Sequence, residues 1–445
     1  MKLIKTVLLA GLSILSLYSH AQVNKQIEIR SELASPIVMQ NSQDKNYLKI
    51  SLTGHEFDSA KRVPINLAIV IDRSGSMQGD RIVKAKEAAI FAINMLNEND
   101  TLSVVAYDND AKVIIPSTKV NNKQKLISLI KENIVADGGT ALFAGLSKGI
   151  HQVEKQLSKD NVNRIILLSD GQANIGPTSV QELSELAIIA AKKNISVSTF
   201  GIGEDYNELL MSSIASYSDG NHVFVNDSLD LENVFVREFK DVMSTVAQHV
   251  KINIYLKDGV KPVRLLGRDG IIKGNQVTVT MNQIYSNQEK YILLEVEQPQ
   301  GKVGEERTIA EIDLVYDDLL DKKTQKEKQS VKLAYTDNLE AVKKALRQDV
   351  VTEIEIQEVN ENSVKALEFY NKGDRKAAQK ILEDNSKRLE AVANMYPEYA
   401  DRVLDDIKWN EKMAADAVNE RGNSKAYRKG MTEKQQNTKL GVIKK

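Results

Sequence analysis

The sequence contains no cysteine among its 445 residues, and that absence removes several classes of chemistry. A chain without thiols cannot form disulfides, build a thiolate metal site, use a cysteine nucleophile or carry a lipid on an N-terminal cysteine. The five histidines show no metal-ligand spacing. Both observations argue against the common nitrogen- and sulfur-ligated metal centres.

The sequence also lacks a strong net charge and a long apolar run beyond its first residues. The formal net charge is −1, which gives no global reason to expect a nucleic acid or an anionic membrane as a partner. Spanning a bilayer takes about 20 consecutive apolar residues, and no later segment reaches that length. We therefore expect no nucleic acid partner and no integral membrane segment in the mature chain.

The first 21 residues have the pattern of a secretory signal peptide. Lys2 and Lys5 supply a positive start, Leu8 to Leu17 supply a short apolar stretch, and Ala21 ends a small-residue cleavage pattern. Cleavage after Ala21 would give an exported product, which we expect in the periplasm, on the cell surface or secreted.

The rest of the chain divides into five stretches by its pattern. Residues 22–63 contain strand-like runs, and residues 64–247 alternate strands with helices, which predicts a doubly wound, mainly parallel α/β sheet. Residues 248–336 read as strands only, and we expect them to form a β-sandwich together with residues 22–63. Residues 337–420 are predicted to form a helical cap or docking element. Residues 421–445 are basic and polar, which predicts a disordered tail.

Oxygen-bearing side chains gather in three loops of the α/β stretch. Asp72-Arg73-Ser74-Gly75-Ser76 follows a buried strand at 65–71, Asp137-Gly138-Gly139-Thr140 precedes a helix, and Ser169-Asp170-Gly171 follows the strand at 164–168. Ligands of open parallel sheets collect beyond the carboxyl ends of the strands. We expect Asp72, Ser74, Ser76, Thr140 and Asp170 to meet there.

Two carboxylates and three hydroxyls suit a hard divalent cation with oxygen ligands, Mg²⁺ or alternatively Mn²⁺ or Ca²⁺, and do not suit zinc. The bland alternative is that Ser-Gly-Ser is an ordinary turn after a strand. A second acidic run, Asp108-Asn109-Asp110, lacks the glycine and glutamate of a calcium loop, so we predict a hairpin turn there.

The three loops resemble the metal-ion-dependent adhesion site of a von Willebrand factor type A domain. The similarity covers about residues 64–247 and includes "NLAIVIDRSGSM", "DGGTALFAGL" and "RIILLSDGQANIG". The resemblance implies that Ser74, Ser76 and Thr140 contact the metal directly, and that Asp72 and Asp170 do so directly or through water. It also implies a vacant position that takes a carboxylate from a partner protein. The wider chain resembles exported bacterial proteins that carry this domain.

The sequence thus predicts an exported, non-catalytic binding protein that holds a divalent cation and captures an acidic residue of a partner protein. One alternative is an envelope assembly scaffold that docks through its C-terminal region and keeps a structural metal. A second alternative is a metal-dependent hydrolase, for which the sequence offers no evident general base.

Overall fold

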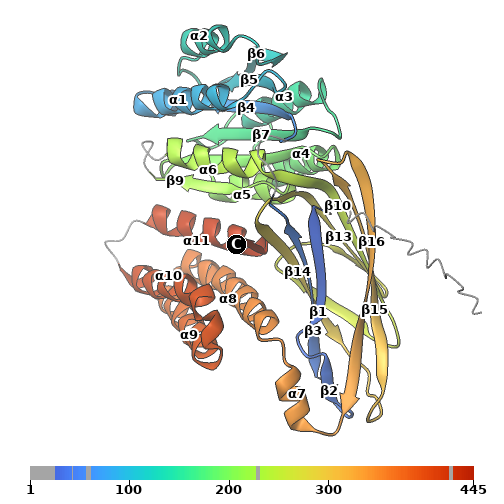
Figure 1. The fold of residues 1–445 in the computed structure, drawn as a ribbon. Coiled ribbons are helices and arrows are strands. Elements are labelled where there is room, and N and C mark those ends of the chain that lie inside the picture. Colours follow the sequence, from blue (N-terminus) through green and yellow to red (C-terminus); the bar gives the residue numbers. More distant parts are fainter. Residues whose placement is uncertain (1–25, 43, 57–61, 227–230, 420–423, 445) are drawn as a thin grey trace, which may run out of the picture.

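The computed structural model describes residues 26–42, 44–56, 62–226, 231–419 and 424–444, which form an α/β unit, a β-sandwich and a helical region (Figure 1). The predicted signal sequence, residues 1–21, lies outside the described residues. Of the helices in the described ranges, none has both the length and the apolar character that crossing a bilayer requires.

The α/β unit is built on a six-stranded sheet in the order β6-β5-β4-β7-β8-β9. Its strands are β4 (Ile65–Asp72), β5 (Thr101–Tyr107), β6 (Ala111–Lys119), β7 (Val162–Ser169), β8 (Ser196–Ile202) and β9 (His222–Val225). All neighbours are parallel except β5 and β6, which form an antiparallel hairpin. The predicted doubly wound sheet and the predicted turn at Asp108–Asp110 are both confirmed.

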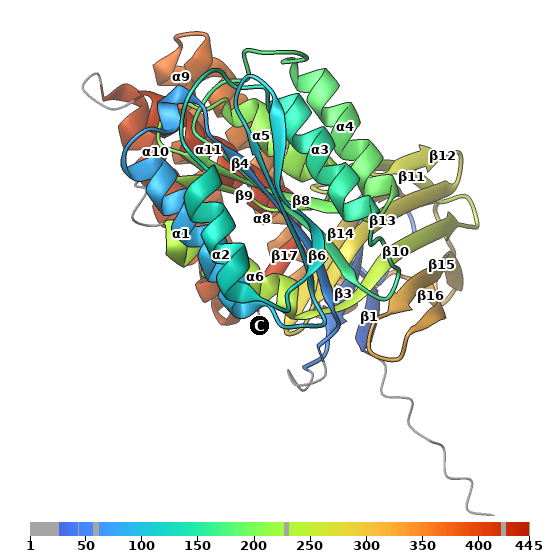
Figure 2. The same ribbon diagram turned by 90° about the horizontal axis from the view of Figure 1, so that it is seen from above.

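Helices cover both faces of this sheet (Figure 2). One face carries α1 (Asp80–Met95), α2 (Lys123–Asn133) and α6 (Leu231–Met243), and the other carries α3 (Leu142–Glu154), α4 (Val180–Lys192) and α5 (Glu208–Tyr217). Side chains of the central strand β4 alternate between the two cores, with Ile69 in one and Val70 in the other. This two-sided burial explains why β4 is apolar from Leu67 to Ile71, directly before Asp72.

The β-sandwich consists of two antiparallel sheets that pack around a separate apolar core. The first contains β1 (Ile27–Leu33), β3 (Lys45–Gly54), β14 (Gln288–Glu297) and β11 (Lys261–Leu266). The second contains β12 (Ile271–Lys273), β13 (Gln276–Tyr285), β10 (Thr245–Leu256), β15 (Glu306–Asp318), β16 (Lys323–Thr336) and, parallel to β16, β2 (Ile37–Met39). Strand β3 pairs with β14 along its whole length, so the α/β unit is inserted into the β-sandwich.

The helical region contains α7 (Leu339–Ala345), α8 (Gln348–Asn371), α9 (Arg375–Met395) and α10 (Ala400–Val418). Gly373 adopts a positive φ of 87° in the tight turn between α8 and α9, a backbone region that favours glycine. Trp409 of α10 is partly buried against the apolar cluster that these helices share.

The prediction of a disordered tail at residues 421–445 is wrong for its described part. Residues Ser424–Lys439 form helix α11, and Val442–Lys444 form strand β17, which pairs with β14 of the sandwich. Helix α11 lies between the α/β unit and the other C-terminal helices (Figure 1). Its buried residues Tyr427 and Met431 supply apolar surface, and acidic side chains elsewhere in the fold neutralise its lysines. This basic segment is ordered because the fold brings acidic side chains from distant parts of the chain close to its lysines.

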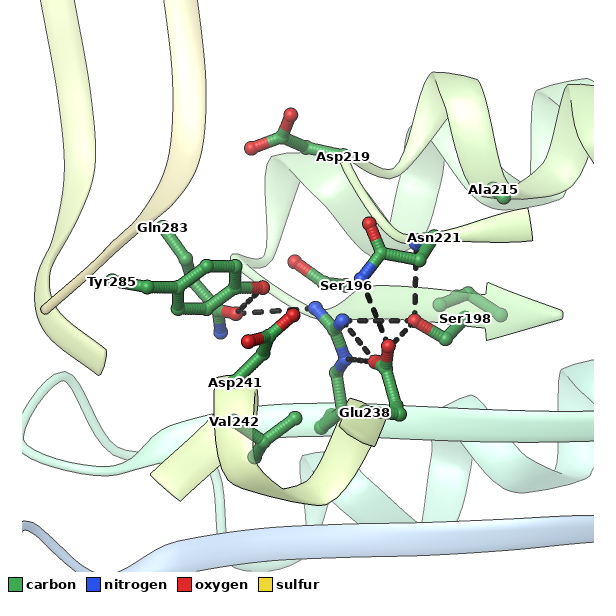
Figure 3. A network of polar contacts seen from close by, with 12 residues as sticks. Ser196, Ser198, Ala215, Asp219, Asn221, Glu238, Asp241, Val242, Gln283 and Tyr285 are labelled. Carbon is green, nitrogen blue, oxygen red and sulfur yellow. Dashed lines mark hydrogen bonds and ion pairs between the residues drawn. The ribbon is translucent and has the colours of Figure 1, made fainter. Parts of the chain in front are cut away.

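A buried polar network joins α6, the amino end of the sheet and the sandwich (Figure 3). The Arg164 guanidinium of β7 donates through Nε to Glu238 Oε1 of α6 at 3.0 Å and through Nη1 to Gln283 Oε1 of β13 at 3.1 Å. Ser198 and Asn221 also donate to the Glu238 carboxylate, at 2.5 and 2.8 Å. The network fixes the α/β unit on the sandwich at the amino ends of the strands, opposite the three loops.

Candidate metal site

The three predicted loops meet at the carboxyl ends of β4 and β7. Asp72 is the last residue of β4, Asp170 directly follows β7, and these two strands are neighbours in the sheet. Backbone hydrogen bonds join the first loop to the loop before α3, since Gly75 N donates to Gly138 O at 2.9 Å and Asp137 N donates to Arg73 O at 2.7 Å. The topology therefore brings together three loops that are far apart in the sequence.

Hydrogen bonds connect four of the five predicted site residues. Ser74 N donates to Asp72 Oδ1 at 2.8 Å, and the hydroxyls of Ser74 and Ser76 lie 3.0 Å apart. Ser76 Oγ donates to Asp170 Oδ1 at 2.8 Å. Ser76 is exposed, whereas Asp72, Ser74 and Asp170 are buried, so the cluster has one face open to solvent.

The fifth residue, Thr140, approaches the same point from the loop before α3. A side-chain carbon placed on Gly171 would lie 3.4 Å from both Ser76 Oγ and Thr140 Oγ1, so the two hydroxyls converge where glycine leaves room. Asn174 holds Thr140 in place, because Thr140 N donates to Asn174 Oδ1 at 2.8 Å and Asn174 N donates to Thr140 O at 3.1 Å.

Asp72 is a buried carboxylate whose hydrogen-bond donors are all neutral in the described residues. Besides Ser74 N, they are Ser169 Oγ at 2.7 Å and Tyr107 OH at 3.3 Å. Burial raises the pKa of Asp72 to about 6, against the lowering effect of its hydrogen bonds with Ser74 and Ser169. A buried negative charge that no cation balances is unfavourable, and a bound cation would offset that cost.

Asp170 differs from Asp72 because an arginine contacts it. Arg81, in the first turn of α1, donates from Nη1 to Asp170 Oδ2 at 2.6 Å, and the same nitrogen lies 3.4 Å from the Ser76 carbonyl oxygen. Sequence reasoning did not identify Arg81. A basic residue in the first turn of a helix is unfavourable because of the helix dipole, and this could have indicated that Arg81 has an acidic partner.

Four further residues that support the site were also missed. These residues position the members of the site, and they are Ser169, Tyr107, Asn109 and Asn174. Asn109 Oδ1 accepts a hydrogen bond from Gly139 N at 2.8 Å. Ser169 is the exception, because the sequence already places it directly before Asp170 in the third predicted loop. Tyr107 and Asn109 come from β5 and the turn after it, and Asn174 of the loop after β7 contacts Thr140, which is distant in the sequence.

The chemistry of this donor set fits a hard divalent cation. Within the described ranges, no group of three or more histidine, aspartate or glutamate side chains is arranged to hold a metal ion. A site in these loops therefore depends on the hydroxyls of Ser74, Ser76 and Thr140 as much as on the two carboxylates. Serine and threonine hydroxyls with carboxylates are oxygen ligands of the kind that Mg²⁺, Mn²⁺ and Ca²⁺ accept.

Comparison with known proteins supports the same fold. Residues 66–237 match the model of the von Willebrand factor type A domain. An uncharacterized protein of Synechocystis is 28% identical over 61% of this chain and 66% of its own length. The uncharacterized protein YfbK of Escherichia coli is 28% identical over 48% of this chain. The alignments span 66% and 37% of the two relatives, so neither is matched over its full length.

Two solved structures match almost the entire chain in fold. A von Willebrand factor type A protein from Catenulispora acidiphila aligns with a TM-score of 0.74 over 95% of this chain and 99% of its own, at 17% identity. The VWA2 paralogue of ArnB from Sulfolobus acidocaldarius aligns with a TM-score of 0.64 over 94% of this chain and 100% of its own, at 16% identity. The combination of α/β unit, sandwich and C-terminal helices therefore recurs in other proteins.

Proposed function

Since residues 66–237 of this chain form a von Willebrand factor type A domain, we propose that the protein is an exported, non-catalytic binding protein that captures an acidic residue of a partner protein through a divalent cation. Domains of this family commonly take part in protein–protein interaction and adhesion. The cation is held by Asp72, Ser74, Ser76, Thr140 and Asp170. When bound, it supplies an electrophilic position that a carboxylate oxygen can occupy.

The observation that carries this proposal is the charge state of the site. Asp72 is completely buried, and its described hydrogen-bond donors are neutral, while the hydroxyls of Ser76 and Thr140 converge beside it. Hydroxyl ligands leave more of the cation's charge uncompensated than carboxylate ligands would. Excess positive charge at an open edge attracts an anionic group of a partner.

Binding is favoured over hydrolysis by the position of the groups that could act as a general base. The four histidines within the described residues lie away from the site: His55 follows β3, His151 is near Glu154 on α3, and His249 contacts Asp317 in the sandwich. His222 is buried between Thr199 and Tyr206, and burial lowers its pKa to about 3. None of these four histidines is positioned to activate a water molecule at the site.

Metal binding is tested by calorimetry and thermal unfolding of the chain from Gln22 onward. Mg²⁺ should raise the melting temperature relative to EDTA, because a ligand that binds only the native state stabilises it by mass action. Asp72→Ala and Ser74→Ala should remove this increase. Asp137→Asn is the matched control, because Asp137 is an exposed carboxylate in the neighbouring loop. An equal Mg²⁺ effect in wild type and Asp72→Ala would contradict the assignment.

Partner capture is tested by affinity purification from envelope extract in Mg²⁺, in EDTA, and with Asp72→Ala in Mg²⁺. A partner retained only by the wild type in Mg²⁺ supports the proposal. A partner retained equally in all three would favour the alternative, a scaffold that docks through its C-terminal helices. Truncation after Tyr335 cannot separate the two, because it also removes α11 and β17, which contact the α/β unit and complete a sandwich sheet.

A further inference from the structure

Arg81 is the one basic side chain in the described residues that bonds to a member of the metal-site set. Its Nη1 donates to Asp170 Oδ2 and to the Ser76 carbonyl, and its side chain is 31% exposed. Every hydrogen bond recorded for Arg81 within the described residues comes from Nη1. A guanidinium has five N–H donors in a planar fork, so the rest of the fork is available to another acceptor.

The fold makes specific room for this guanidinium. Gly203, directly after β8, has a positive φ of 70°, and a side-chain carbon there would lie 2.8 Å from Arg81 Nη2. The positive φ favours glycine at this position, and the guanidinium lies close to its backbone. Two other charged pairs lie on this face: Asp205 of the same loop bonds to Lys425 of α11 at 2.8 Å, and Arg73 bonds to Asp108 at 2.6 Å. Arg81 is thus the cation that remains directed at Asp170.

Arg73 of the first loop pairs with Asp108 at 2.6 Å, and its side chain is 21% exposed. Three arginine–carboxylate pairs at the amino ends of the strands are more completely enclosed. They are Arg62 with Asp100 at 2.6 Å, Arg268 with Asp219 at 2.5 Å, and Arg164 with Glu238. The three arginine side chains are 14%, 7% and 0% exposed. Arg81 is more exposed than any of them and sits beside an open cluster of hydroxyls, which is where a ligand would arrive.

The formal charges of this cluster lead to a specific role. Asp72 and Asp170 with Arg81 carry a net charge of −1, and a divalent cation raises it to +1. Without Arg81, the formal charges of the loaded site would sum to zero, and only the local charge of the cation would attract an anion. We propose that Arg81 is a positioning residue with two effects: it competes with the divalent cation for Asp170, and in the loaded site it provides the positive charge and N–H donors that hold the partner's carboxylate.

This inference rests on the proposed function and extends it to the chemistry of the captured group. A carboxylate can accept two parallel hydrogen bonds from a guanidinium fork, whereas a neutral amide offers one acceptor oxygen and no charge. The loaded site should therefore prefer aspartate or glutamate side chains of a partner to asparagine or glutamine.

The two effects of Arg81 on binding have opposite signs, and Arg81→Gln tests both. Titration with Mn²⁺ alone should give about tenfold tighter binding in the variant, because a repelling cation and a competitor for Asp170 are both removed. Acetate is then titrated into the Mn²⁺-loaded protein, with displacement of metal-bound water followed by water-proton relaxation. The acetate dissociation constant should rise at least about threefold in the variant.

Two further variants keep the test specific. Arg81→Lys retains the charge but not the fork, so its Mn²⁺ affinity should stay near that of the wild type and its acetate affinity should be intermediate. Lys84→Gln removes the same charge from α1 one turn later, where Lys84 pairs with Glu87, and should change neither constant. Unchanged melting temperatures in EDTA would show that the variants are folded.

The possible outcomes separate this inference from the proposed function. If the wild type does not bind Mn²⁺, the proposed function fails at its first step. If the wild type binds Mn²⁺ but Arg81→Gln leaves both constants unchanged, weakens both or strengthens both, the inference alone is overturned. Tighter Mn²⁺ binding together with weaker acetate binding supports it, because a general loss of structure would weaken both.

Discussion

Carboxylates are buried at both ends of the strands of the α/β sheet, but their charge is balanced differently. We call the side where the parallel strands begin the amino edge and the side where they end the carboxyl edge. At the amino edge, Arg164 contacts Glu238 and Arg268 contacts Asp219. At the carboxyl edge, Arg81 contacts Asp170 in the same way, but Asp72 is equally buried and its described donors are neutral. Burial alone raises the pKa of any carboxyl group. The charge of Arg164 nevertheless brings the pKa of Glu238 below its usual value. Asp72 has no such partner among its described donors, and its pKa is raised to about 6.

This difference distinguishes a carboxylate that is paired with a cation within the fold from one that is not. A buried ion pair whose hydrogen bonds are satisfied is complete within the chain, and it fixes α6 and the sandwich against the sheet. Under the proposed function, a cation from solution balances the buried carboxylate of Asp72. The comparison predicts opposite consequences for the same chemical change, the replacement of a carboxylate by its amide, at the two edges.

The largest expected effect is at the amino edge. Glu238→Gln should lower the free energy of unfolding by about 3–5 kcal/mol, because it leaves the fully buried Arg164 guanidinium without a counter-charge. Chemical denaturation in EDTA measures this value. Glu182→Gln on the surface of α4 is the control and should have little effect. A loss no larger than that of the control would contradict the structural role of the pair.

The next effect concerns the C-terminal helix. Lys429 of α11 is buried, and its Nζ donates to Tyr206 O at 2.7 Å and to Glu208 Oε2 at 3.0 Å. Lys429→Met should cost about 2 kcal/mol, because it leaves both acceptors without this donor. Lys425→Met removes an exposed lysine one turn earlier and should produce no measurable change. Equal denaturation midpoints for both variants would mean that α11 contributes nothing at this contact.

A third carboxylate, Glu433 of α11, allows a test by pH of how burial without a strong cationic partner affects stability. Burial raises the pKa of Glu433 to about 7, although a backbone hydrogen bond with Phe224 and the charge of Arg237 act in the opposite direction. The folded state therefore binds this proton more tightly than the unfolded state. Stability should be greatest below the unfolded pKa and decline as the pH rises through 7, by up to about 2 kcal/mol between pH 5.5 and 8. Glu433→Gln should remove this part of the pH dependence, and an unchanged profile would refute the assignment.

The smallest effect on stability is expected at the carboxyl edge. Asp72→Asn in EDTA should change the free energy of unfolding by no more than about 1 kcal/mol, because the carboxylate has no cation to lose. The same variant should lose the increase in melting temperature that Mg²⁺ gives the wild type. A loss in EDTA as large as that of Glu238→Gln would mean that Asp72 is balanced within the fold, and the contrast between the edges would fail.

The metal-site edge was predictable because its information is local in the sequence. Each loop combines a strand end, a glycine and an oxygen-bearing side chain, and the parallel order of β4 and β7 follows from the alternation of strands and helices. The residues that complete the site, Arg81 and Asn174, were not predictable in this way. An arginine in a helix and an asparagine in a loop are common, and only the packing of α1 and the loop after β7 gives them their contacts.

The C-terminal segment shows the opposite case. Its composition is basic and polar, which is typical of a segment that does not fold alone. Nothing within residues 424–444 reveals that Asp205, Glu208 and Asp269 lie where its lysines need them, or that β14 has an edge open to β17. The order of this segment depends on partners that are more than a hundred residues away.

The sequence by itself determined the alternation that gives a doubly wound sheet, the all-strand stretch that follows it, and the five oxygen-bearing residues of the candidate metal site. The tertiary structure alone decided which buried carboxylates receive an arginine, how residues 424–444 join the three parts, and that Arg81 faces Asp170. The physical reason is the range of the interactions. Periodicity and turns act between neighbours in the chain, whereas charge balance in a buried site depends on groups that only the completed fold brings within a few ångströms.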